Sequence, residues 1–528
     1  MSKIAQYLNE HLLGHVSGLG TLREQYSSDA GVLEVTPELV VYPKATNDIR
    51  KVARFSWQLA EKGHVLSLTP RGFGNDVTGG AIGSGLLIDT SRYLNSILYV
   101  AIKDKDKIAH VQPGVSLKTL HETLRWNGLT IGAYTPDMQD MTVGGAIASG
   151  VSTYRSGKYG TIADAIDRME VVLANGDLME IGRVSKRDLS KKQGEQTLEG
   201  EIYRQIDAIL EENAELIASL SSDADNTGYR IDQVQQKDGS FDLTPLFIGS
   251  QGTLGLISEV VLRTDFYNEE EAAMAIVCNT FSEARDVADI LEKIEPTTLL
   301  SIDSSYYEMA QAHGKSYLFN EKDEDFSTVV YVSFDDFSDK ARERKIKKAL
   351  KALSKKEVAI YTSLDSRIED LYAIRDVAQI AMTPLRIDET YAPVCDGAHI
   401  PTVRLSEFAT EVTALAEKYH TVLPLSIDML TGVVSTRALL RLKKVSDKQK
   451  VFKLSAEYAA LVHKMGGSVT GGQAEGRLGA FAEYPQLDEA VVELNNKIRK
   501  VFDPYGTLNP GVKQQADLKS LIRLLKDN

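Results

Sequence analysis

A glycine-rich segment near the N-terminus holds the residues best suited to chemistry, Thr69-Pro70-Arg71-Gly72-Phe73-Gly74-Asn75-Asp76-Val77-Thr78-Gly79-Gly80. It lies between two apolar runs, His64–Leu68 and Leu86–Ile88, which predict strands. A loop of this kind can curl so that successive backbone N–H groups point at one place and bind a phosphate without a cationic side chain. An ordinary tight turn is the alternative, because glycine supplies positive φ angles wherever a chain bends.

The segment differs from the dinucleotide-binding fingerprint of a Rossmann fold. That fingerprint, Gly-x-Gly-x-x-Gly, leads directly into a helix, whereas this segment leads through Gly83-Ser84-Gly85 into a predicted strand. A phosphate bound here would therefore lie in a loop between two strands, held by local amide dipoles.

The composition is that of a globular protein with a substantial core. The chain has 528 residues, of which 43% are hydrophobic and 25% charged. This length allows about two to four domains or one large composite domain. The formal net charge of −14 argues against nonspecific binding to nucleic acid or anionic membranes. It still allows a small anionic ligand in a locally positive pocket.

Cysteine usage and hydropathy predict a cytoplasmic protein. Cys278 and Cys395 are too few for a disulfide framework, a four-cysteine zinc site or an iron–sulfur cluster, and a reducing compartment suits them. We predict no metal site. The N-terminus lacks the apolar core of a signal peptide. The sequence contains no run of about 18 apolar residues, so no transmembrane helix is expected.

The rest of the chain predicts a mixture of strands and helices. A strand at Leu39–Pro43 precedes a helix at Ile49–Lys62, for which Asn47 is the expected N-cap. The turn Asn175-Gly176 predicts a hairpin. From about residue 266 the pattern changes to longer strands and amphipathic helices. The charged helix expected at Lys340–Leu353 is interpreted as a solvated face.

Two more glycine clusters follow the first, and a turn-rich C-terminus completes the series. The second cluster is Thr142–Gly150 with Gly157–Gly160 close behind, the third is Ile248–Ile257, and the C-terminal segment contains Asn509-Pro510-Gly511. Their order resembles the flavin oxidoreductases of the vanillyl-alcohol oxidase/p-cresol methylhydroxylase type. Within that type, the chain resembles the branch of D-lactate dehydrogenase and the glycolate oxidase D subunit. The resemblance runs from about residue 25 to residue 513.

The resemblance implies an α+β fold with an FAD-binding domain and a cap domain. Residues 1–30 would form a helical lead-in, and 31–265 an FAD-binding domain of two subdomains, 31–95 and 96–265. Residues 266–480 would form an α+β cap, or substrate, domain with an antiparallel sheet. Residues 481–528 would return as a helical segment that completes the FAD site.

The resemblance also implies the residues that contact FAD. The diphosphate loop would supply Pro70, Arg71, Gly72, Phe73, Gly74, Asn75, Asp76, Thr78 and Gly79. The flavin and adenine-ribose sides would be lined by Pro136, Asp137, Thr142, Val143, Gly144, Gly145, Ser149, Gly150, Gly157, Tyr159, Gly160, Gly255, Ile257 and Asn509. Backbone can approach a flat ring or a diphosphate only where Cβ atoms are missing, which suits the glycines. Some relatives attach FAD covalently through a histidine in the first loop. Asn75 at that position cannot form the bond, so noncovalent FAD is expected.

The resemblance implies hydride transfer from a substrate C–H group to flavin N5, with a second acceptor that reoxidises the flavin. The expected substrate is a small alcohol, in particular a D-2-hydroxy acid such as D-lactate or glycolate. The protein would position the reacting carbon and take the hydroxyl proton.

The chain departs from this branch in one motif. Where relatives carry Glu-His-Gly-Ile-Gly-Arg, this chain has Gly472-Gln473-Ala474-Glu475-Gly476-Arg477, so Gln473 replaces the histidine. An upstream His-x-x-x-Gly-Asn-x-His pattern is also missing, and Ser426–Gly432 lies in its region. The motif therefore does not identify the residue that acts as the catalytic base.

Four residues remain as catalytic candidates: Arg375, Arg477, His399 and Glu475. Arg375 resembles the family's substrate arginine, whose planar fork would hold a carboxylate in two parallel hydrogen bonds; a surface charge is the alternative. His399 could be a base or a structural histidine. Glu475 would act as a base if burial raised its pKa, with a salt bridge to Arg477 as the alternative.

Two other functions stay open at this point. One is an oxidoreductase of the same fold for a sugar, an aldonolactone or an aromatic alcohol. The other is a flavin-binding electron-transfer subunit without turnover, beside a partner that carries iron–sulfur clusters. The electron acceptor, the oligomeric state and a peripheral membrane attachment like that of some relatives are also left open.

Overall fold

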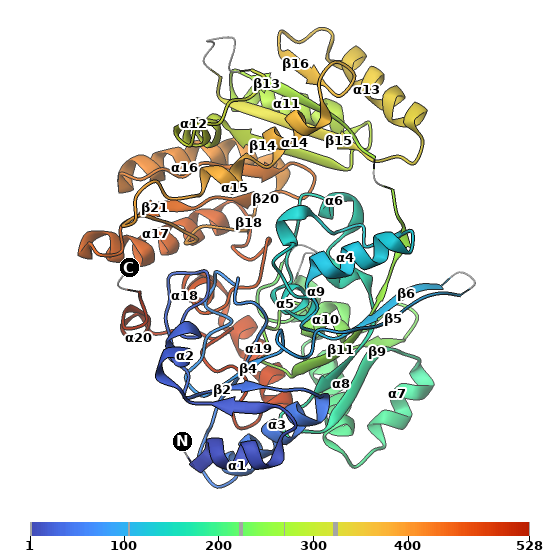
Figure 1. Cartoon of the computed structure of the whole chain (residues 1–528), viewed down its shortest axis with the longest axis vertical. Helices are drawn as coiled ribbons and strands as arrows, with labels where there is room; N and C mark the ends of the chain where they lie inside the picture. The colour runs from blue at the N-terminus through green and yellow to red at the C-terminus, as the bar shows by residue number, and fades with distance from the viewer. Residues whose placement is uncertain (1–2, 104–105, 221–224, 269, 320–325, 527–528) are drawn as a thin grey trace. The chain divides into compact units, whose positions relative to one another are not determined.

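The computed structural model describes residues 3–103, 106–220, 225–268, 270–319 and 326–526 (Figure 1). The contacts divide the chain into two compact units, called here the first unit and the second unit. The first unit comprises the described residues up to Val151, together with Thr161–Asp265 and Gln473–Lys526. The second unit comprises Ser152–Gly160 and Phe266–Gly472. The last part of the chain thus returns to the first unit.

A four-stranded sheet in the order β1-β2-β4-β3 forms the N-terminal part of the first unit. Its strands are β1 (His15–Ser17), β2 (Leu39–Tyr42), β3 (Leu68–Arg71) and β4 (Leu86–Asp89). Strands β2, β4 and β3 are parallel, and α3 (Thr46–Ala60) connects β2 to β3. Helix α3 buries Ile49, Val52 and Ala53 in a core shared with this sheet. The glycine-rich segment is the connection from β3 to β4.

The prediction of a strand at His64–Leu68 is wrong, because β3 starts at Leu68 and includes Pro70. Proline lacks a backbone N–H group and normally disrupts a sheet ladder. It is tolerated here because β3 is the last strand in the sheet order. The strand therefore delivers Arg71 directly to the start of the loop.

The prediction of Asn47 as an N-cap is also wrong. The cap residue of α3 is Ala45, whose side chain accepts no hydrogen bond. The carboxylate of Asp48, in the first helical turn, instead accepts the N–H of Lys44, which lies just before the helix, at 2.9 Å. The same carboxylate accepts two backbone N–H groups that precede β1. One buried acidic side chain therefore joins the helix start to the neighbouring segment.

An antiparallel sheet in the order β10-β9-β8-β11-β6-β5 forms the other part of the first unit. Its strands are β5 (Ile97–Lys103), β6 (Asp106–Val111), β8 (Ile166–Val172), β9 (Leu178–Val184), β10 (Phe241–Asp242) and β11 (Leu256–Arg263). Strands β8 and β9 form the predicted hairpin, with Val172 opposite Leu178 and Gly176 at φ 84° in the turn.

Helices cover the sheets of the first unit, and the C-terminal helix α19 completes its core. Leu494, Ile498 and Phe502 of α19 are buried in the same cluster as Ile202 and Tyr203 of α8. The remaining elements are α1 (Lys3–His11), α2 (Gly20–Gln25), α4 (Leu117–Trp126), β7 (Leu129–Thr130), α5 (Val143–Ser149), α7 (Lys186–Gln193), α8 (Leu198–Glu212), α9 (Ala214–Ser219), α10 (Thr244–Phe247), β12 (Asp265–Phe266), α18 (Leu478–Glu483), α19 (Glu489–Phe502) and α20 (Leu518–Ile522).

A seven-stranded sheet in the order β16-β13-β15-β14-β19-β20-β18 forms the second unit, and its strand pairs are antiparallel. The strands are β13 (Ala272–Cys278), β14 (Thr298–Asp303), β15 (Thr328–Phe334), β16 (Ala359–Thr362), β18 (Ala398–His399), β19 (Ser426–Asp428) and β20 (Val433–Ser435); β17 (Thr390–Ala392) pairs separately with β21 (Ala438–Leu440). The helices are α6 (Ser156–Tyr159), α11 (Phe281–Glu292), α12 (Ser304–Ala312), α13 (Asp339–Leu353), α14 (Ile368–Arg375), α15 (Val377–Ala381), α16 (Leu405–Tyr419) and α17 (Val445–Lys464).

The predicted fold class is confirmed: both units mix helices and sheets, and the sheet of the second unit is antiparallel. None of the helices in the described ranges combines the length and the apolar character that crossing a membrane requires.

Candidate functional site

A pocket lies in the first unit, around the glycine-rich segments. The predicted FAD contacts that line it are Pro70, Arg71, Gly72, Phe73, Gly74, Asn75, Asp76, Thr142, Gly144, Gly145, Ser149, Gly255 and Ile257. The structure thus brings together residues from three separate glycine clusters.

The first half of the glycine-rich loop leaves its backbone donors free. In the described part of the chain, the N–H groups of Gly72, Phe73, Gly74 and Asn75 have no hydrogen-bond acceptor. These four residues line the cavity. Unpaired amides in succession are the arrangement that binds phosphate oxygens. The residues present therefore fit the diphosphate of FAD.

The second half of the loop is occupied by its own aspartate. The Asp76 carboxylate accepts the N–H groups of Thr78 at 2.8 Å and Gly80 at 3.0 Å. Burial raises the pKa of Asp76, and these hydrogen bonds oppose that shift. Neither Thr78 nor Gly79 lines the cavity. Asp76 therefore fixes the second half of the loop, whereas the unpaired amides lie in the first half.

Arg71 supplies a cation at the wall of the cavity. Its side chain is largely buried and lies over the ring of Tyr26, with the guanidinium carbon 5.2 Å from the ring centroid. Its Nη1 donates to two backbone carbonyls, at 3.3 Å to Ala81 and 3.5 Å to Tyr26. Burial lowers the pKa of Arg71. A bound diphosphate would offset the desolvation of this cation.

The second glycine cluster forms a short helix, α5, with a polar start and a glycine end. Thr142 caps it by accepting the N–H of Gly145 at 3.1 Å. Gly144 permits close packing, because an added Cβ would lie 2.7 Å from the Cβ of Pro113. Gly150 ends the helix in the left-handed region at φ 61°. Val143 lies in the core.

Asn509 clamps the loops instead of lining the cavity. Its Nδ2 donates to the carbonyl oxygens of Gly80 and Gln251, both at 2.8 Å. Thr69 donates to its Oδ1 at 3.1 Å. Asn509 therefore joins the first and third glycine clusters to the C-terminal segment.

Gln251 is a site residue that was not among the predicted FAD contacts. Its Nε2 donates to Thr78 Oγ1 at 3.0 Å, and its Oε1 accepts the N–H of Gly476 at 2.9 Å. The third glycine cluster, which contains it, was the available signal. The other cavity-lining residues absent from the predicted set are Gly80, Ala81, Thr90, Pro113, Asp140, Met141, Ala148, Val151, Ser250, Gly252 and Gln473.

The remaining predicted FAD contacts lie outside this cavity. Thr78, Gly79, Pro136, Asp137, Val143, Gly150 and Asn509 belong to the first unit without lining it, and Gly157, Tyr159 and Gly160 belong to the second unit. Pro136 and Asp137 are exposed.

A buried carboxyl group, Asp29, lies behind the diphosphate loop. The segment is joined to the loop by the bond from Ala30 N to Asp76 O, at 2.9 Å. Oδ1 of Asp29 accepts the N–H of Gly31, whereas Oδ2 has no partner among the described residues. Burial, followed by the charge of Asp76, raises the pKa of Asp29 to about 7.

This shift predicts a loss of stability as the pH rises. The unfolded carboxyl titrates near pH 4 and the folded one near 7, so the folded state binds more protons in between. The stabilising contribution is complete below about pH 4, declines up to about pH 7 and is then absent. We expect Asp29→Asn, which cannot ionise, to remove this decline. Urea unfolding of the wild type and of Asp29→Asn at pH 5 and pH 8 measures the change in the free energy of unfolding. Equal changes in the two proteins would show that Asp29 does not cause the decline.

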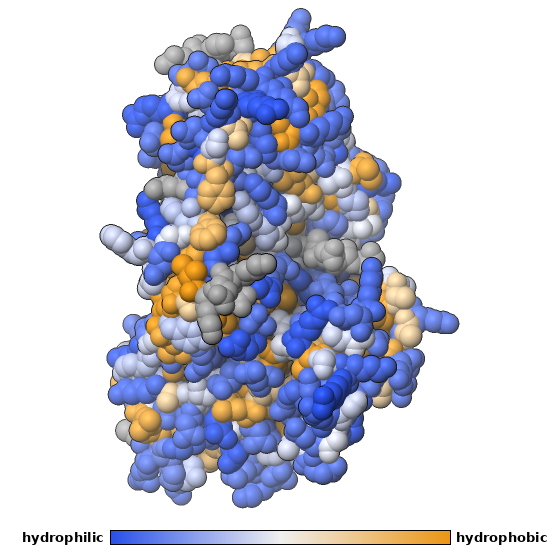
Figure 2. Space-filling model, turned by 90° about the vertical axis from the view of Figure 1, so that its right-hand side faces the viewer, coloured by the Kyte–Doolittle hydropathy of each residue, from blue (hydrophilic) through white to orange (hydrophobic). Residues whose placement is uncertain are grey.

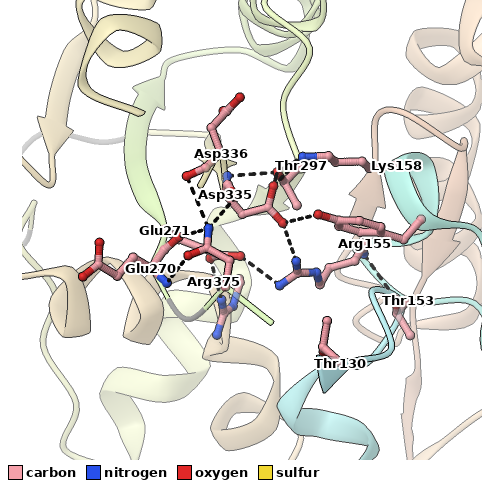
Figure 3. A network of polar contacts seen from close by, with 12 residues as sticks. Thr130, Thr153, Arg155, Lys158, Glu270, Glu271, Thr297, Asp335, Asp336 and Arg375 are labelled. Atoms are coloured by element: carbon pink, nitrogen blue, oxygen red, sulfur yellow. Dashed lines mark hydrogen bonds and ion pairs between the residues drawn. The ribbon is translucent and has the colours of Figure 1, made fainter. Parts of the chain in front are cut away.

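Arg375 lies in the second unit, at the end of α14 (Figure 3). Its Nε and Nη2 donate to the two carboxylate oxygens of Asp376 at 2.7 and 2.8 Å. Its Nη1 lies 3.8 Å from Glu271 Oε2. The rings of Tyr154 and Tyr372 lie within 5 Å of the guanidinium carbon. Burial opposes the charge of Arg375, but Asp376 outweighs it and raises the pKa.

Asp335 is the centre of the adjoining polar network (Figure 3). It accepts hydrogen bonds from Arg155, Lys158, Thr297 and the hydroxyl of Tyr159. Burial opposes the charge of Asp335, and the hydrogen bonds from Lys158, Thr297 and Tyr159 nevertheless lower its pKa. Tyr159, predicted to contact the flavin, thus donates its hydroxyl to a carboxylate of the second unit.

His399 ends strand β18, also in the second unit. Its backbone N–H donates to Ser468 O at 2.7 Å. Gly471 packs against it, since an added Cβ there would lie 2.4 Å from the Cβ of His399. The side chain is half-buried. Among the described residues, no group of three His, Cys, Asp or Glu side chains could hold a metal ion.

Glu475 and Arg477 belong to the first unit, where both bind protein atoms. The alternative of a salt bridge between them is wrong, because Glu475 Oε2 pairs with Lys513 Nζ at 2.6 Å. Arg477 donates to the carbonyl oxygens of Pro510 at 2.7 Å and Ile82 at 2.8 Å. Burial lowers the pKa of Arg477 to about 10. The two side chains attach the C-terminal segment to the glycine-rich loop.

We expect Lys513→Met to destabilise the protein by about 3–5 kcal/mol, the cost of leaving one partner of a buried ion pair uncompensated. The pair is fully buried, and burial raises the pKa of Glu475. Glu475→Gln combined with Lys513→Met should recover most of the loss. Lys418→Met is the control, because its pair with Glu457 is exposed. Urea unfolding measures all three, and equal losses at Lys513 and Lys418 would contradict the prediction.

Comparison with known proteins agrees with this architecture. The FAD binding domain family matches residues 37–182, and the family described as "FAD linked oxidases, C-terminal domain" matches residues 267–512. A solved structure of p-cresol methylhydroxylase with substrate bound has the same fold, with a TM-score of 0.70 at 14% identity over 98% of this chain and 97% of that chain.

Two bacterial oxidoreductases are similar in sequence to most of this chain. The D-2-hydroxyglutarate dehydrogenase of Haemophilus influenzae is 25% identical over 95% of this chain and 50% of its own length. The glycolate oxidase subunit GlcD of Bacillus subtilis is 24% identical over 94% of this chain and 93% of its own length. The chain spans about half the length of the D-2-hydroxyglutarate dehydrogenases that it matches.

These matches confirm the resemblance inferred from the glycine clusters, and the FAD binding domain implies FAD as the cofactor. The chain belongs to the FAD-linked oxidoreductases that join an FAD binding domain to an FAD linked oxidase C-terminal domain.

Proposed function

We propose that this protein is an FAD-dependent dehydrogenase that oxidises a 2-hydroxy acid: a D-2-hydroxy acid such as D-lactate or D-2-hydroxyglutarate, or the achiral glycolate. The observation that carries the proposal is the set of unpaired amides at Gly72–Asn75, which line a glycine-walled cavity next to the Arg71 cation. Two relatives named for 2-hydroxy-acid oxidation support the substrate class.

The chain's residues divide the work of cofactor binding. The amides of Gly72–Asn75 and the Arg71 guanidinium would hold the diphosphate, and Gly144, Gly145 and Ile257 would line the flavin. We propose a noncovalent complex, because Asn75 offers no nucleophile. Bound FAD would accept a hydride at N5. Glu475 and Arg477 would act by positioning the loops, since their charged groups are already bound to protein atoms.

Arg375 and His399 are the substrate residues we propose. Nη1 of Arg375 forms no hydrogen bond with Asp376 and lies 3.8 Å from Glu271 Oε2. We propose that Nη1 donates to the substrate carboxylate in place of this long contact with Glu271. An imidazole nitrogen of His399 would accept the hydroxyl proton as the C–H bond breaks. Tyr154 and Tyr372, stacked on Arg375, would restrict its motion.

Anaerobic reduction tests the proposal. The purified yellow protein is mixed, without oxygen, with D-lactate, L-lactate, glycolate, D-2-hydroxyglutarate, a sugar, an aldonolactone and an aromatic alcohol. Bleaching of the visible flavin band by a D-2-hydroxy acid supports it. Bleaching only by a sugar, an aldonolactone or an aromatic alcohol would show that the substrate belongs to that class and is not a hydroxy acid. A protein that takes up no FAD would overturn the proposal.

A flavin-binding electron-transfer subunit is the second candidate, and the pairing of Arg375 with Asp376 favours it. A guanidinium already held by a carboxylate in two hydrogen bonds is less available to a substrate. In this case the yellow protein would be inert to the whole panel and yet be reduced by dithionite. In both cases a separate electron acceptor is needed.

The two free buried thiols, Cys278 and Cys395, support a reducing cytoplasm as the location.

A further inference from the structure

A buried carboxylate, Glu271, lies between two arginines of the second unit (Figure 3). Its Oε1 accepts a hydrogen bond from Arg155 Nη1 at 3.1 Å. Its Oε2 faces Arg375 Nη1 at 3.8 Å, a distance longer than a hydrogen bond. Glu271 therefore balances the charge of Arg375 and leaves the Nη1 donor available to another acceptor.

The charged groups of this part of the second unit balance one another. Arg375 pairs with Asp376 at 2.7 Å. Asp335, just after β15, pairs with Arg155 and with Lys158. With the central glutamate, the three cations and three carboxylates carry no net charge. We call these six residues the Arg375 cluster: Arg155, Lys158, Glu271, Asp335, Arg375 and Asp376.

Two buried polar atoms beside the Arg375 cluster have no hydrogen-bond partner among the described residues. They are Nε of Arg155 and the hydroxyl oxygen of Tyr331. The ring of Tyr331 lies 5.9 Å from the guanidinium carbon of Arg375. Both groups can donate a hydrogen bond. Because buried polar groups normally find a partner, unused donors favour a place where a polar ligand binds.

The Arg375 cluster is shielded from bulk water. Hydrophilic side chains cover most of the molecular face drawn in Figure 2, and on such a face water and salt screen a charge. Within the cluster, in contrast, the side chains of Glu271 and Asp335 are only 9% and 4% exposed. A ligand carboxylate at Arg375 would add a fourth negative charge there, where charges interact strongly.

We propose that Glu271 holds Arg375 ready for the substrate and takes up one proton from solution when the substrate carboxylate binds. This inference rests on the proposed function, in which Arg375 Nη1 donates to that carboxylate. Oε2 of Glu271 becomes O–H and gives up its contact with Arg375, while Oε1 stays bound to Arg155. The substrate carboxylate then replaces the lost negative charge, and the cluster is neutral again. Glu271 acts through Arg375 and is therefore a positioning residue.

The charges around Glu271 suit this uptake of a proton. Burial raises the pKa of Glu271, and the charges of Arg155 and Arg375 oppose that shift. Asp335 raises the pKa further, and Lys158 lowers it. A bound anion is one more like charge and raises the pKa again. The anion therefore binds fully below the pKa of the free protein, and its affinity declines as the pH rises from that pKa toward the pKa of the complex.

Two tyrosines also face Glu271, Tyr331 of β15 and Tyr372 of α14. Burial raises the pKa of Tyr372 to about 12 and that of Tyr331 well above its usual value. Both hydroxyls therefore stay neutral between pH 6 and pH 8 and add nothing to a pH dependence in this range.

The test is the affinity of the FAD-loaded protein for propanoate, a carboxylate without a 2-hydroxyl group. Isothermal titration calorimetry measures its Kd from pH 6 to pH 8 in two buffers with different ionisation heats. For the wild type we expect the Kd to rise at least about tenfold over this range, with one proton taken up at pH 8. Glu271→Gln should bind at least about tenfold more tightly than the wild type at pH 8, with a Kd that does not depend on pH.

Glu270→Gln is the matched control. Glu270 is the preceding residue, pairs with Arg342, and is 65% exposed. This variant should keep the Kd and the pH dependence of the wild type. FAD content and unfolding midpoint show that each variant is folded, and the wild-type titration decides the question without any variant.

Steady-state kinetics with an oxidised 2-hydroxy acid give a second readout. Glu271→Gln should lower KM at pH 8 and change kcat by less than about twofold, because it alters binding without altering the reacting groups. A merely structural role of Glu271 would instead lower kcat or the FAD content and leave the pH dependence of the Kd in place.

The outcomes separate this inference from the proposed function. A wild-type Kd that does not change with pH, or one that still changes in Glu271→Gln, would overturn the inference even if a hydroxy acid bleaches the flavin. An inert substrate panel together with the expected pH dependence would reject the dehydrogenase and support the role of Glu271. If the wild type does not bind propanoate, both the carboxylate site at Arg375 and the inference are overturned.

Discussion

Gly74→Val should abolish the retention of FAD, with a loss of affinity of at least about 100-fold. Gly74 has φ 79° in the left-handed region, where a β-branched residue is strained by roughly 1–3 kcal/mol. An added Cβ would also lie 2.1 Å from Arg71 Nη2 and 2.4 Å from its Cζ. The substitution would displace the cation and the unpaired amides together. Absorbance of the purified protein, relative to its protein content, measures retained FAD.

The chain offers a control with the same backbone strain and no neighbours. Gly63 has φ 83°, and no described residue other than Gly63 and its two chain neighbours has a heavy atom within 4 Å of the position of an added Cβ. Gly63→Val should destabilise the fold by a similar strain energy and retain stoichiometric FAD. Full FAD retention by a folded Gly74→Val variant would show that the loop does not hold the diphosphate.

Arg375→Lys should lower kcat/KM for the best substrate of the panel about 100-fold while FAD content stays unchanged. Lysine keeps the positive charge but loses the planar fork, and charge-assisted hydrogen bonds contribute about 1.5–3 kcal/mol each. Arg375→Met, which also removes the charge, should cost about tenfold more. Steady-state kinetics with an artificial electron acceptor provide the measurement.

Arg367→Lys is the matched control, because Arg367 precedes the same helix α14 and its side chain is 76% exposed. Its kcat/KM should equal that of the wild type. An unchanged kcat/KM in Arg375→Lys would show that Arg375 does not bind the substrate. A loss of FAD would indicate that the pair of Arg375 with Asp376 has a structural role instead.

Local sequence patterns predicted elements well where one short-range signal dominates. The Asn175-Gly176 turn gave a hairpin because two residues decide its geometry. The charged pattern of 340–353 gave α13 because its apolar residues recur at helical spacing. Strand β3 was misplaced because proline counts against a strand unless it lies at an edge, and sheet order is a property of the whole fold.

The candidate site was predictable to the extent that it is built from backbone. Missing Cβ atoms are visible in a sequence, and thirteen predicted FAD contacts line one cavity. Side-chain partners were less predictable, because they join residues tens to hundreds of positions apart. Glu475 pairs with Lys513 and not with its near neighbour Arg477. Gln251 likewise bridges Thr78 and Gly476, a role no spacing rule reveals.

The attachment of Asn509 to Gly80 and Gln251 has a consequence for biosynthesis. The clamp joins residues that lie 429 and 258 positions apart in the sequence, so it forms only after Asn509 has emerged from the ribosome. The walls of the cleft are therefore synthesised well before the contact that holds them together. Cofactor binding that depends on the clamp would have to wait for the segment that contains Asn509.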